Sequence, residues 1–137
     1  RYRLVAGPLW VLDTSAGSNI ACIPVACSDE TTALTTGTAK IKFRMPFAMT
    51  LQSVKASLST AQASGSIFTV DINEAGASIL STKLTIDNTE KTSTTAATAA
   101  VTPDTSMDDD SGITVEVDPV GDGTAKGLKV YLIGVPV

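Results

Sequence analysis

The chain has 137 residues, a formal net charge of −4 at neutral pH and no histidine, and 43% of its residues are hydrophobic while only 4% are aromatic. This length fits one domain with a single core. The lack of histidine rules out the usual Ser-His-acid nucleophile and, with only two cysteines, argues against zinc. The acidic balance argues against nucleic-acid binding by bulk electrostatics, so the sequence predicts no catalytic residue, no cofactor and no nucleic-acid partner.

The charge is unevenly distributed along the chain. Residues 1–68 carry six basic and three acidic groups, and residues 69–137 carry four basic and eleven acidic groups, which gives +3 and −7. Such a dipolar distribution can favour self-association, but only weakly here, because strands of both halves are expected to mix in space. No apolar run approaches the ~18 residues of a membrane span, so none is predicted.

Residues 1–28 are the irregular part of the sequence. Leu9, Trp10 and Leu12 form an apolar group between Pro8 and the polar stretch TSAGSN. This layout suits an N-terminal arm or anchor segment that docks onto a neighbouring subunit, and these three residues are candidate partner-binding residues. The alternative is a first edge strand laid across the domain that follows.

Cys22 and Cys27 are five positions apart. On an extended strand they would be separated by about 16 Å, beyond the ~7 Å that a disulfide tolerates between Cα atoms, unless Pro24 folds the segment back. The sequence therefore predicts two free thiols.

Alternation begins at Thr38. In the stretch AKIKFRM, Ile41, Phe43 and Met45 alternate with three cations. This pattern predicts a half-buried strand with the apolar residues inward, which Pro46 ends. The outward cations, Lys40, Lys42 and Arg44, are candidate contacts for acidic lipid, nucleic acid or a partner's carboxylates. The alternative is that they form the solvated side of a sheet and bind no partner.

The same period continues to the C-terminus. Further strands are predicted in LQSVKASLS, with Val54, Ala56 and Leu58 inward, and in IFTVDINE, with Phe68, Val70 and Ile72 on one face. The other predicted strands are ILSTKLTID, the segment that Ile113, Val115 and Val117 open, and LKVYLIGV, with turns such as EAGAS between them. Helical periodicity is unconvincing even in TTAATAAV, which is crowded with threonines and followed by Pro103. The sequence predicts an all-β fold: a single antiparallel β-sandwich, jelly-roll-like, over residues 29–137, with residues 1–28 as an irregular arm.

Several acidic and glycine-rich stretches permit a chemical interpretation. Asp108 to Asp110 could hold calcium, but they lack the spaced D-x-D-x-D-G pattern, so a solvated loop is favoured. Asp71 with Glu74, or Glu116 with Asp118, could be paired carboxylates for glycoside chemistry; ordinary exposed charge is favoured for them. VGDGT lacks a P-loop ending and predicts a hairpin turn.

The pieces SDETTALTTGTAK, FRMPFAMTL, ILSTKLTID and GLKVYLIG carry a resemblance to a known family. They are similar to a β-sandwich module of tailed-bacteriophage virion surface proteins, of the head-decoration, head-fibre or tail-fibre C-terminal type. The resemblance covers Cys27 to Gly134, about four fifths of the chain, whereas Arg1 to Ala26 departs from it. It implies a structural module on the particle surface, usually without enzymatic activity.

Three functions follow as expectations. The first is a non-enzymatic virion structural protein that decorates or reinforces the capsid, with the major capsid protein or other virion subunits as partners and homo-oligomers expected. The second is a fibre tip that binds a host surface receptor, a glycan, through the loops 61–66, 89–111 and 121–127. The third, a secreted carbohydrate-binding module, is disfavoured because few aromatic residues are available to stack on sugars.

Overall fold

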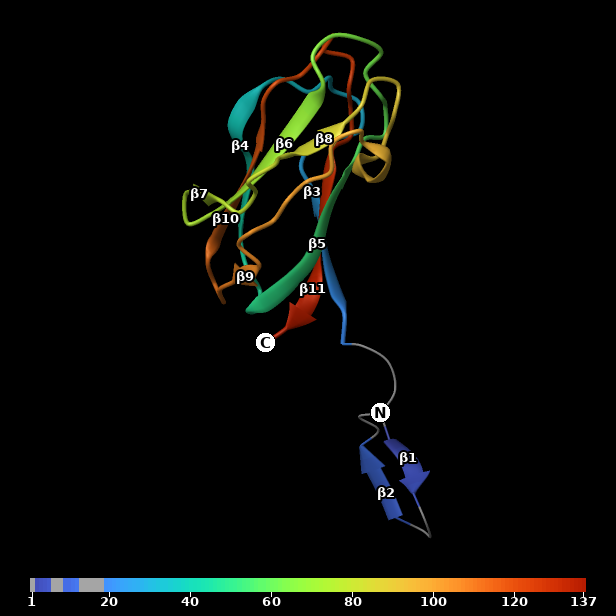
Figure 1. The fold of residues 1–137 in the computed structure, drawn as a ribbon, viewed down its shortest axis with the longest axis vertical. Helices are drawn as coiled ribbons and strands as arrows, with labels where there is room; N and C mark the ends of the chain where they lie inside the picture. The colour runs from blue at the N-terminus through green and yellow to red at the C-terminus, as the bar shows by residue number, and fades with distance from the viewer. Residues whose placement is uncertain (1, 6–8, 13–18) are drawn as a thin grey trace.

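The computed structural model describes the backbone of residues 2–5 and 9–12, and the backbone and side chains of residues 19–137. The described residues are almost entirely strand and loop (Figure 1). One 3₁₀ turn, η1 (Ser93–Thr95), is the only helical element in this part of the chain, which therefore has no helix that could span a membrane. The strands are β1 (Tyr2–Val5), β2 (Leu9–Leu12), β3 (Ala21–Ala26), β4 (Gly37–Arg44), β5 (Met49–Ser57), β6 (Phe68–Glu74), β7 (Ala77–Ser78), β8 (Leu84–Ile86), β9 (Ser106–Met107), β10 (Gly112–Val117) and β11 (Lys129–Pro136).

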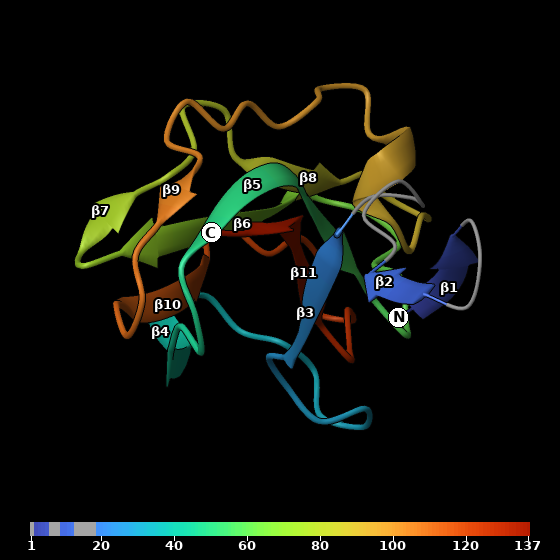
Figure 2. The same cartoon turned by 90° about the horizontal axis from the view of Figure 1, so that it is seen from below.

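Two antiparallel sheets pack together as a β-sandwich, as the sequence predicts (Figures 1 and 2). The β6 sheet has the order β4-β10-β6-β7, with β8 also paired to β6. The β11 sheet has the order β3-β11-β5-β9. Strands β1 and β2 pair antiparallel with each other, in the register Tyr2 to Leu12.

The chain crosses between the sheets at almost every connection. Strands β3, β5, β9 and β11 belong to one sheet, and the strands that alternate with them in sequence, β4, β6 and β10, belong to the other. Such crossing connections are typical of jelly-roll-like sandwiches, in which sequential strands pair with distant ones. Sheet partners are therefore far apart in sequence.

The core fills the space between the two sheets. It is built from the inward positions of both, and its largest fully buried side chains are those of Phe68, Met45, Met49, Ile72, Ile79, Ile86, Met107, Ile113, Leu128 and Leu132. The predicted inward sets of β5 and β6 are confirmed, because Val54, Ala56, Leu58, Val70 and Ile72 are buried. Alternation places them there, since successive side chains in a strand point to opposite faces.

The inward set of β4 is buried less evenly. Met45 is 2% exposed, whereas Ile41 and Phe43 are half-buried and pack against the core from its side. The reason is that β4 is the edge strand of the β6 sheet, with β10 on one side only. The β4–β10 ladder is also irregular between Val115 and Val117, next to Ala39, which has φ of 51°. The strict alternation expected from Thr38 therefore holds only from Ile41 onward.

The hairpin between β6 and β7 follows the predicted turn in EAGAS. Glu74 pairs with Ala77, so Ala75 and Gly76 form a two-residue loop with φ of 49° and 86°. Two consecutive positive φ values are the signature of the tight hairpin turn that matches strand twist. Of the strand predicted in ILSTKLTID only Leu84–Ile86 forms, as β8. The residues before it are not part of a strand, and Thr82 pairs instead with Val101 of the long polar segment.

The predicted boundary between arm and sandwich is also wrong. Residues 21–26 were assigned to the arm of residues 1–28, but they form β3, which pairs with β11 along its whole length. Its Val25 is buried in the core, and its Pro24 lies on an edge strand, where a missing N–H is tolerated. The alternative of a first edge strand is correct for this segment.

Candidate functional site

The cationic residues predicted on β4 are close together but differ in their contacts. Lys40 is half-buried and donates from Nζ to Thr35 Oγ1 at 2.8 Å. Arg44 is exposed and donates to both carboxylate oxygens of Asp110, at 3.0 and 3.3 Å. Lys42 is exposed, and the described residues give it no ion-pair partner. Lys42 and Arg44 also line a shallow groove of about 410 Å³ at this end of the sheet.

The other predicted contacts, Leu9, Trp10 and Leu12, lie in β2, where the structure describes the backbone alone. Their side chains lie outside the described residues. The backbone of β2 runs antiparallel to β1, with Leu4 opposite Trp10. The two groups predicted for partner binding therefore belong to different elements, one to the β1–β2 hairpin and one to the edge of the β6 sheet.

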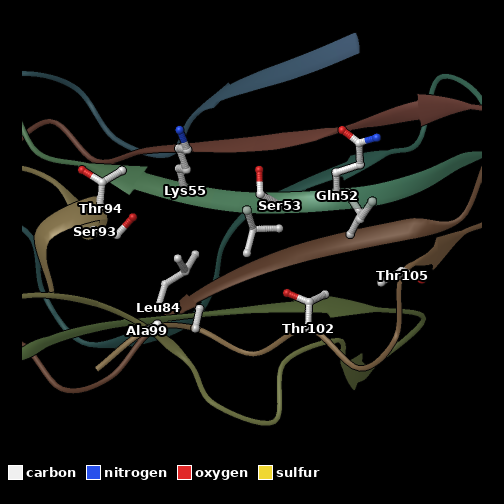
Figure 3. A pocket seen from close by; sticks show the side chains of 12 residues that line it. Gln52, Ser53, Lys55, Leu84, Ser93, Thr94, Ala99, Thr102 and Thr105 are labelled. Carbon is white, nitrogen blue, oxygen red and sulfur yellow. The ribbon is translucent and has the colours of Figure 1, made fainter. Parts of the chain in front are cut away.

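A groove that the sequence does not predict lies along β5, and we call it the β5 groove (Figure 3). It has a volume of about 400 Å³ and runs between β5 and the segment that follows η1. In Figure 3 Gln52, Ser53 and Lys55 project from one side of β5, and Leu84 and Ala99 lie on the facing wall. The complete lining is Leu51, Gln52, Ser53, Val54, Lys55, Leu84, Ser93, Thr94, Ala99, Ala100, Thr102 and Thr105.

The β5 groove coincides with a gap in the hydrogen bonding of the sheet edge. On the side of β5 away from β11, Leu51 N–H donates to Thr105 O at 2.7 Å and Ala56 N–H donates to Ser93 Oγ at 2.9 Å. Strand backbone groups alternate in direction, so Val54 directs its N–H and C=O the same way as Ala56. No described residue bonds to Val54 there, because β9 pairs only with Met49 and Thr50.

Two of the loops proposed for receptor binding meet at one end of the sandwich. Gln62 is 1% exposed; its Nε2 donates to Ser66 O at 2.6 Å, and its Oε1 accepts from Gly121 N at 2.9 Å. Asp122 accepts from the N–H groups of Ala63 and Ser64 at 2.9 and 3.0 Å. Loops 61–66 and 121–127 therefore form one cross-linked surface.

Hydrogen bonds also set the charge of Asp122. The Thr124 hydroxyl donates to its Oδ1 at 2.6 Å, and three backbone N–H groups add further bonds. These donors stabilise the carboxylate and lower the pKa of Asp122 from its ordinary 3.8 to about 2, with the Thr124 hydroxyl as the largest cause. A carboxylate held this strongly is suited to fixing a loop rather than to accepting a proton at neutral pH.

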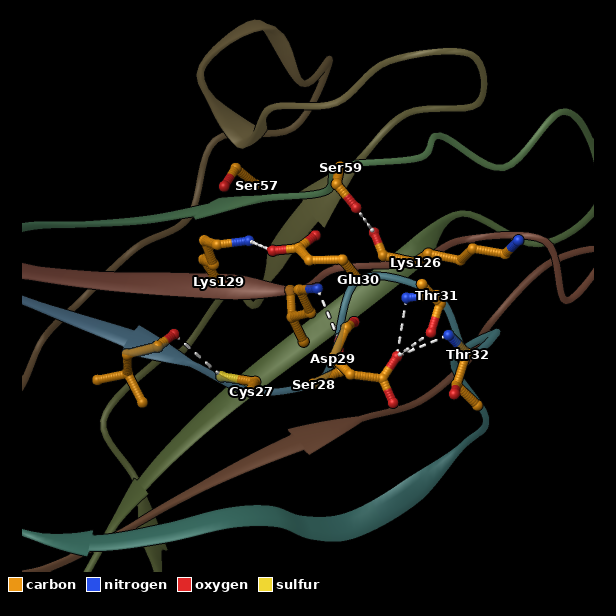
Figure 4. A network of polar contacts seen from close by, with 12 residues as sticks. Cys27, Ser28, Asp29, Glu30, Thr31, Thr32, Ser57, Ser59, Lys126 and Lys129 are labelled. Atoms are coloured by element: carbon orange, nitrogen blue, oxygen red, sulfur yellow. Dashed lines mark hydrogen bonds and ion pairs between the residues drawn. The ribbon is translucent and has the colours of Figure 1, made fainter.

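A second polar network ties the segment after β3 to the start of β11 (Figure 4). Asp29 Oδ1 accepts from the N–H groups of Thr31 and Thr32 at 2.8 and 2.6 Å, which lowers its pKa. Glu30 forms an ion pair with Lys129, which lowers the pKa of Glu30 chiefly through the hydrogen bond that Lys129 donates. Both carboxylates have donors as neighbours, so we assign them a structural role.

Of the carboxylates considered for acid-base chemistry, Asp71 differs from the prediction and Asp118 is exposed, as expected. Asp71 was expected to be exposed, but it is 6% exposed, because β6 lies between β10 and β8 and its carboxylate contacts Ser78 Oγ at 2.5 Å and Lys83 Nζ at 3.5 Å. Asp71, Glu116 and Asp118 line one pocket of about 100 Å³ together with Lys83. Asp71 already accepts hydrogen bonds from the Ser78 hydroxyl and from the N–H of Ile72, so we assign it a structural role.

The acidic triplet forms part of a loop. Asp110 binds Arg44, and the N–H of Asp108 donates to Glu74 at 2.8 Å. Glu74 also accepts from the Ser111 hydroxyl at 2.6 Å, so it anchors this loop instead of pairing with Asp71. Within residues 19–137 no three His, Cys, Asp or Glu side chains are placed to hold a metal ion.

Both cysteines are free, as predicted. Cys22 is exposed on β3, and Cys27 is buried just beyond it. Burial raises the pKa of the Cys27 thiol to about 11, so this thiol stays protonated at neutral pH.

The β5 groove could not have been found from alternation alone. The sequence predicts the strand β5, but a gap in its pairing depends on where residues 93 and 105 are placed by the fold. Chemically, the groove offers an apolar floor, a rim of hydroxyls and one unpaired set of backbone groups, which together suit the binding of an extended segment.

Comparison of the chain with protein-family models, with curated proteins and with solved structures gave no match.

Proposed function

We propose that this protein is a non-enzymatic structural protein of a bacteriophage virion that decorates or reinforces the capsid surface. The observation that carries the proposal is the separation of β1 and β2 from the sandwich. In the described part of the chain β1 and the apolar strand β2 pair with each other and with no strand of either sheet. A segment of this kind is available to grip the major capsid protein or a neighbouring copy.

The sandwich itself supports the same proposal. Its polar clusters join loops to strands, and its stability rests on burial and on strand pairing between distant segments. The sequence pieces that resemble phage virion surface proteins support the particle surface as the location of the protein. Function then resides in surfaces, with homo-oligomers and other virion subunits as the partners.

A fibre tip that binds a host glycan is the second candidate, and one observation favours it. The loops 61–66 and 121–127 form a cross-linked surface at one end of the sandwich, as expected for a preorganised receptor-binding tip. The third proposed loop, 89–111, instead runs along the side of β5, where Thr92 and Thr105 flank the groove.

The location and copy number of the protein on purified particles separate the two candidates. Density mapping at a resolution that resolves strands should show copies repeating over the whole shell, with the segment around Trp10 against the shell protein. Trp10→Ala should then reduce occupancy on the particle. Density confined to a tail end or to sparse spikes would reject decoration and support the fibre tip, which glycan-array binding would test next.

A further inference from the structure

We propose that the β5 groove of one copy binds β2 of a second copy, which adds as a strand to the open edge of β5. The inference rests on the proposed docking role of the N-terminal segment and names the surface that receives it. Its test uses purified protein in solution and no particle. The assembly of copies and the attachment to a virion can therefore succeed or fail separately.

The backbone of β5 supplies the first argument. The edge is closed by Thr105 at Leu51 and by Ser93 at Ala56, and the Val54 N–H and C=O between them face the groove. At ~3.3 Å per residue, the open stretch from Leu51 to Ala56 is about 17 Å long and β2, from Leu9 to Leu12, is about 10 Å long. An added strand of this length satisfies Val54 without displacing either closure.

The floor of the groove supplies the second argument. Leu51, Val54 and Leu84 are apolar and lie between the two sheets, and Ala99 and Ala100 complete the facing wall. The sequence of β2, LWVL, is apolar at every position. When an extended segment adds to a sheet edge, its main chain gives affinity and its alternate side chains enter pockets beside the edge. A segment with no polar side chain matches this floor.

Charge supplies the third argument. Residues 1–12 contain Arg1 and Arg3 and no acidic residue, a formal charge of +2. Residues 84–105, which contain the facing wall, carry Asp87, Glu90 and Asp104 against one basic residue, Lys91, a formal charge of −2. Lys55, the one charged side chain among the described residues that line the groove, reduces the net charge of this face to −1. The arm and this face are therefore of opposite sign, which adds a weak attraction to docking.

A second copy is the occupant that the single chain favours. In the described part of the chain β2 pairs with β1 and with no strand of the β11 sheet, so the chain's own β2 leaves the β5 groove open. Exchange of identical elements between copies is a low-cost route to closed homo-oligomers, because each copy provides one segment and one receiving surface.

The test compares the full-length protein with two arginine variants. Ala99 is exposed and lines the groove, so Ala99→Arg obstructs it and repels the arginines of the arm. Ala97→Arg is the matched control, because Ala97 is exposed on the same segment but does not line the groove. Circular dichroism should show the same fold for all three. Sedimentation over a concentration series should show an oligomer whose dissociation constant rises at least tenfold in Ala99→Arg and is unchanged in Ala97→Arg.

Trp10 is the single tryptophan of the chain and reports directly on the arm. Its emission should shift to shorter wavelength as the wild type assembles, and it should keep the emission of a solvated indole in Ala99→Arg. A wild type that is monomeric at all concentrations overturns the proposal. So does an oligomer that tolerates Ala99→Arg, and so does a monomer with short-wavelength emission, which would place β2 in the groove of its own chain.

Discussion

Gly121 tests whether the contact between the loops 61–66 and 121–127 holds this end of the sandwich together. Its backbone lies so close to the first loop that the Cβ of an alanine would stand 2.4 Å from Ser64 O and 2.7 Å from Ser66 O. Both neighbours are backbone atoms, which cannot rotate away as a side chain tip can. Gly121→Ala must therefore push the two loops apart.

The cost follows from the bonds that this movement breaks. Gln62 is buried; it links the loops by accepting from Gly121 N, and its Nε2 donates to Ser66 O within its own loop. A buried polar group left without a partner costs ~1–3 kcal/mol, and overpacking adds ~1–3 kcal/mol. We expect Gly121→Ala to lower the free energy of unfolding by about 2–6 kcal/mol, a large part of the ~5–15 kcal/mol of a typical domain.

The assay is urea unfolding followed by circular dichroism, with Gly123→Ala as the matched control. Gly123 has φ of 75°, but an added Cβ there meets nothing within 4 Å. The control therefore carries only the cost of a left-handed backbone, about 1–2 kcal/mol. If Gly121→Ala lowers the free energy of unfolding no more than Gly123→Ala, the close contact between the loops does not stabilise the fold and the argument is refuted.

Three further predictions concern the core, pH and the thiols. Phe68→Ala removes a side chain with 0% exposure and should lower the free energy of unfolding, measured in urea, by about 3–5 kcal/mol. Ile67→Ala, at a position that is 39% exposed, should change it little, and equal effects of the two variants would contradict the assigned core. The folded-state pKa of Asp122 is depressed to about 2, so the stability that this carboxylate contributes is complete above pH 3.8 and is lost as pH falls toward 2. The difference in free energy of unfolding between wild type and Asp122→Asn should therefore shrink over that pH window. A constant difference would argue against the hydrogen bonds that hold Asp122. A thiol reagent should modify Cys22 alone in the native protein and Cys27 only after unfolding, as peptide mass mapping will show; equal rates at both would mean that Cys27 is not buried.

The strands that sequence predicts best are those with one buried face and one solvated face. In β5 and β10 the alternation of side chains follows from the pleat of a single strand, so Val54, Ala56, Ile113 and Val115 could be placed inward without knowing any partner strand. Free thiols at Cys22 and Cys27 follow in the same way, because the reach of five extended residues is fixed by covalent geometry. These properties are local.

Sheet membership, edges and gaps were decided by the tertiary structure. Ala21–Ala26 is a strand because β11, more than a hundred residues later, pairs with it. Asp71 is buried because the strands β8 and β10, which flank β6, and the side chains of Ser78 and Lys83 surround it. The edge of β5 is open at Val54 because the long polar segment hydrogen-bonds to β5 at Leu51 and at Ala56 on this side, and the backbone between these two residues has no partner there among the described residues. Alternation states which way a side chain points, but the pairing of distant strands depends on the free energy of the whole chain, and that pairing decides what each side chain meets.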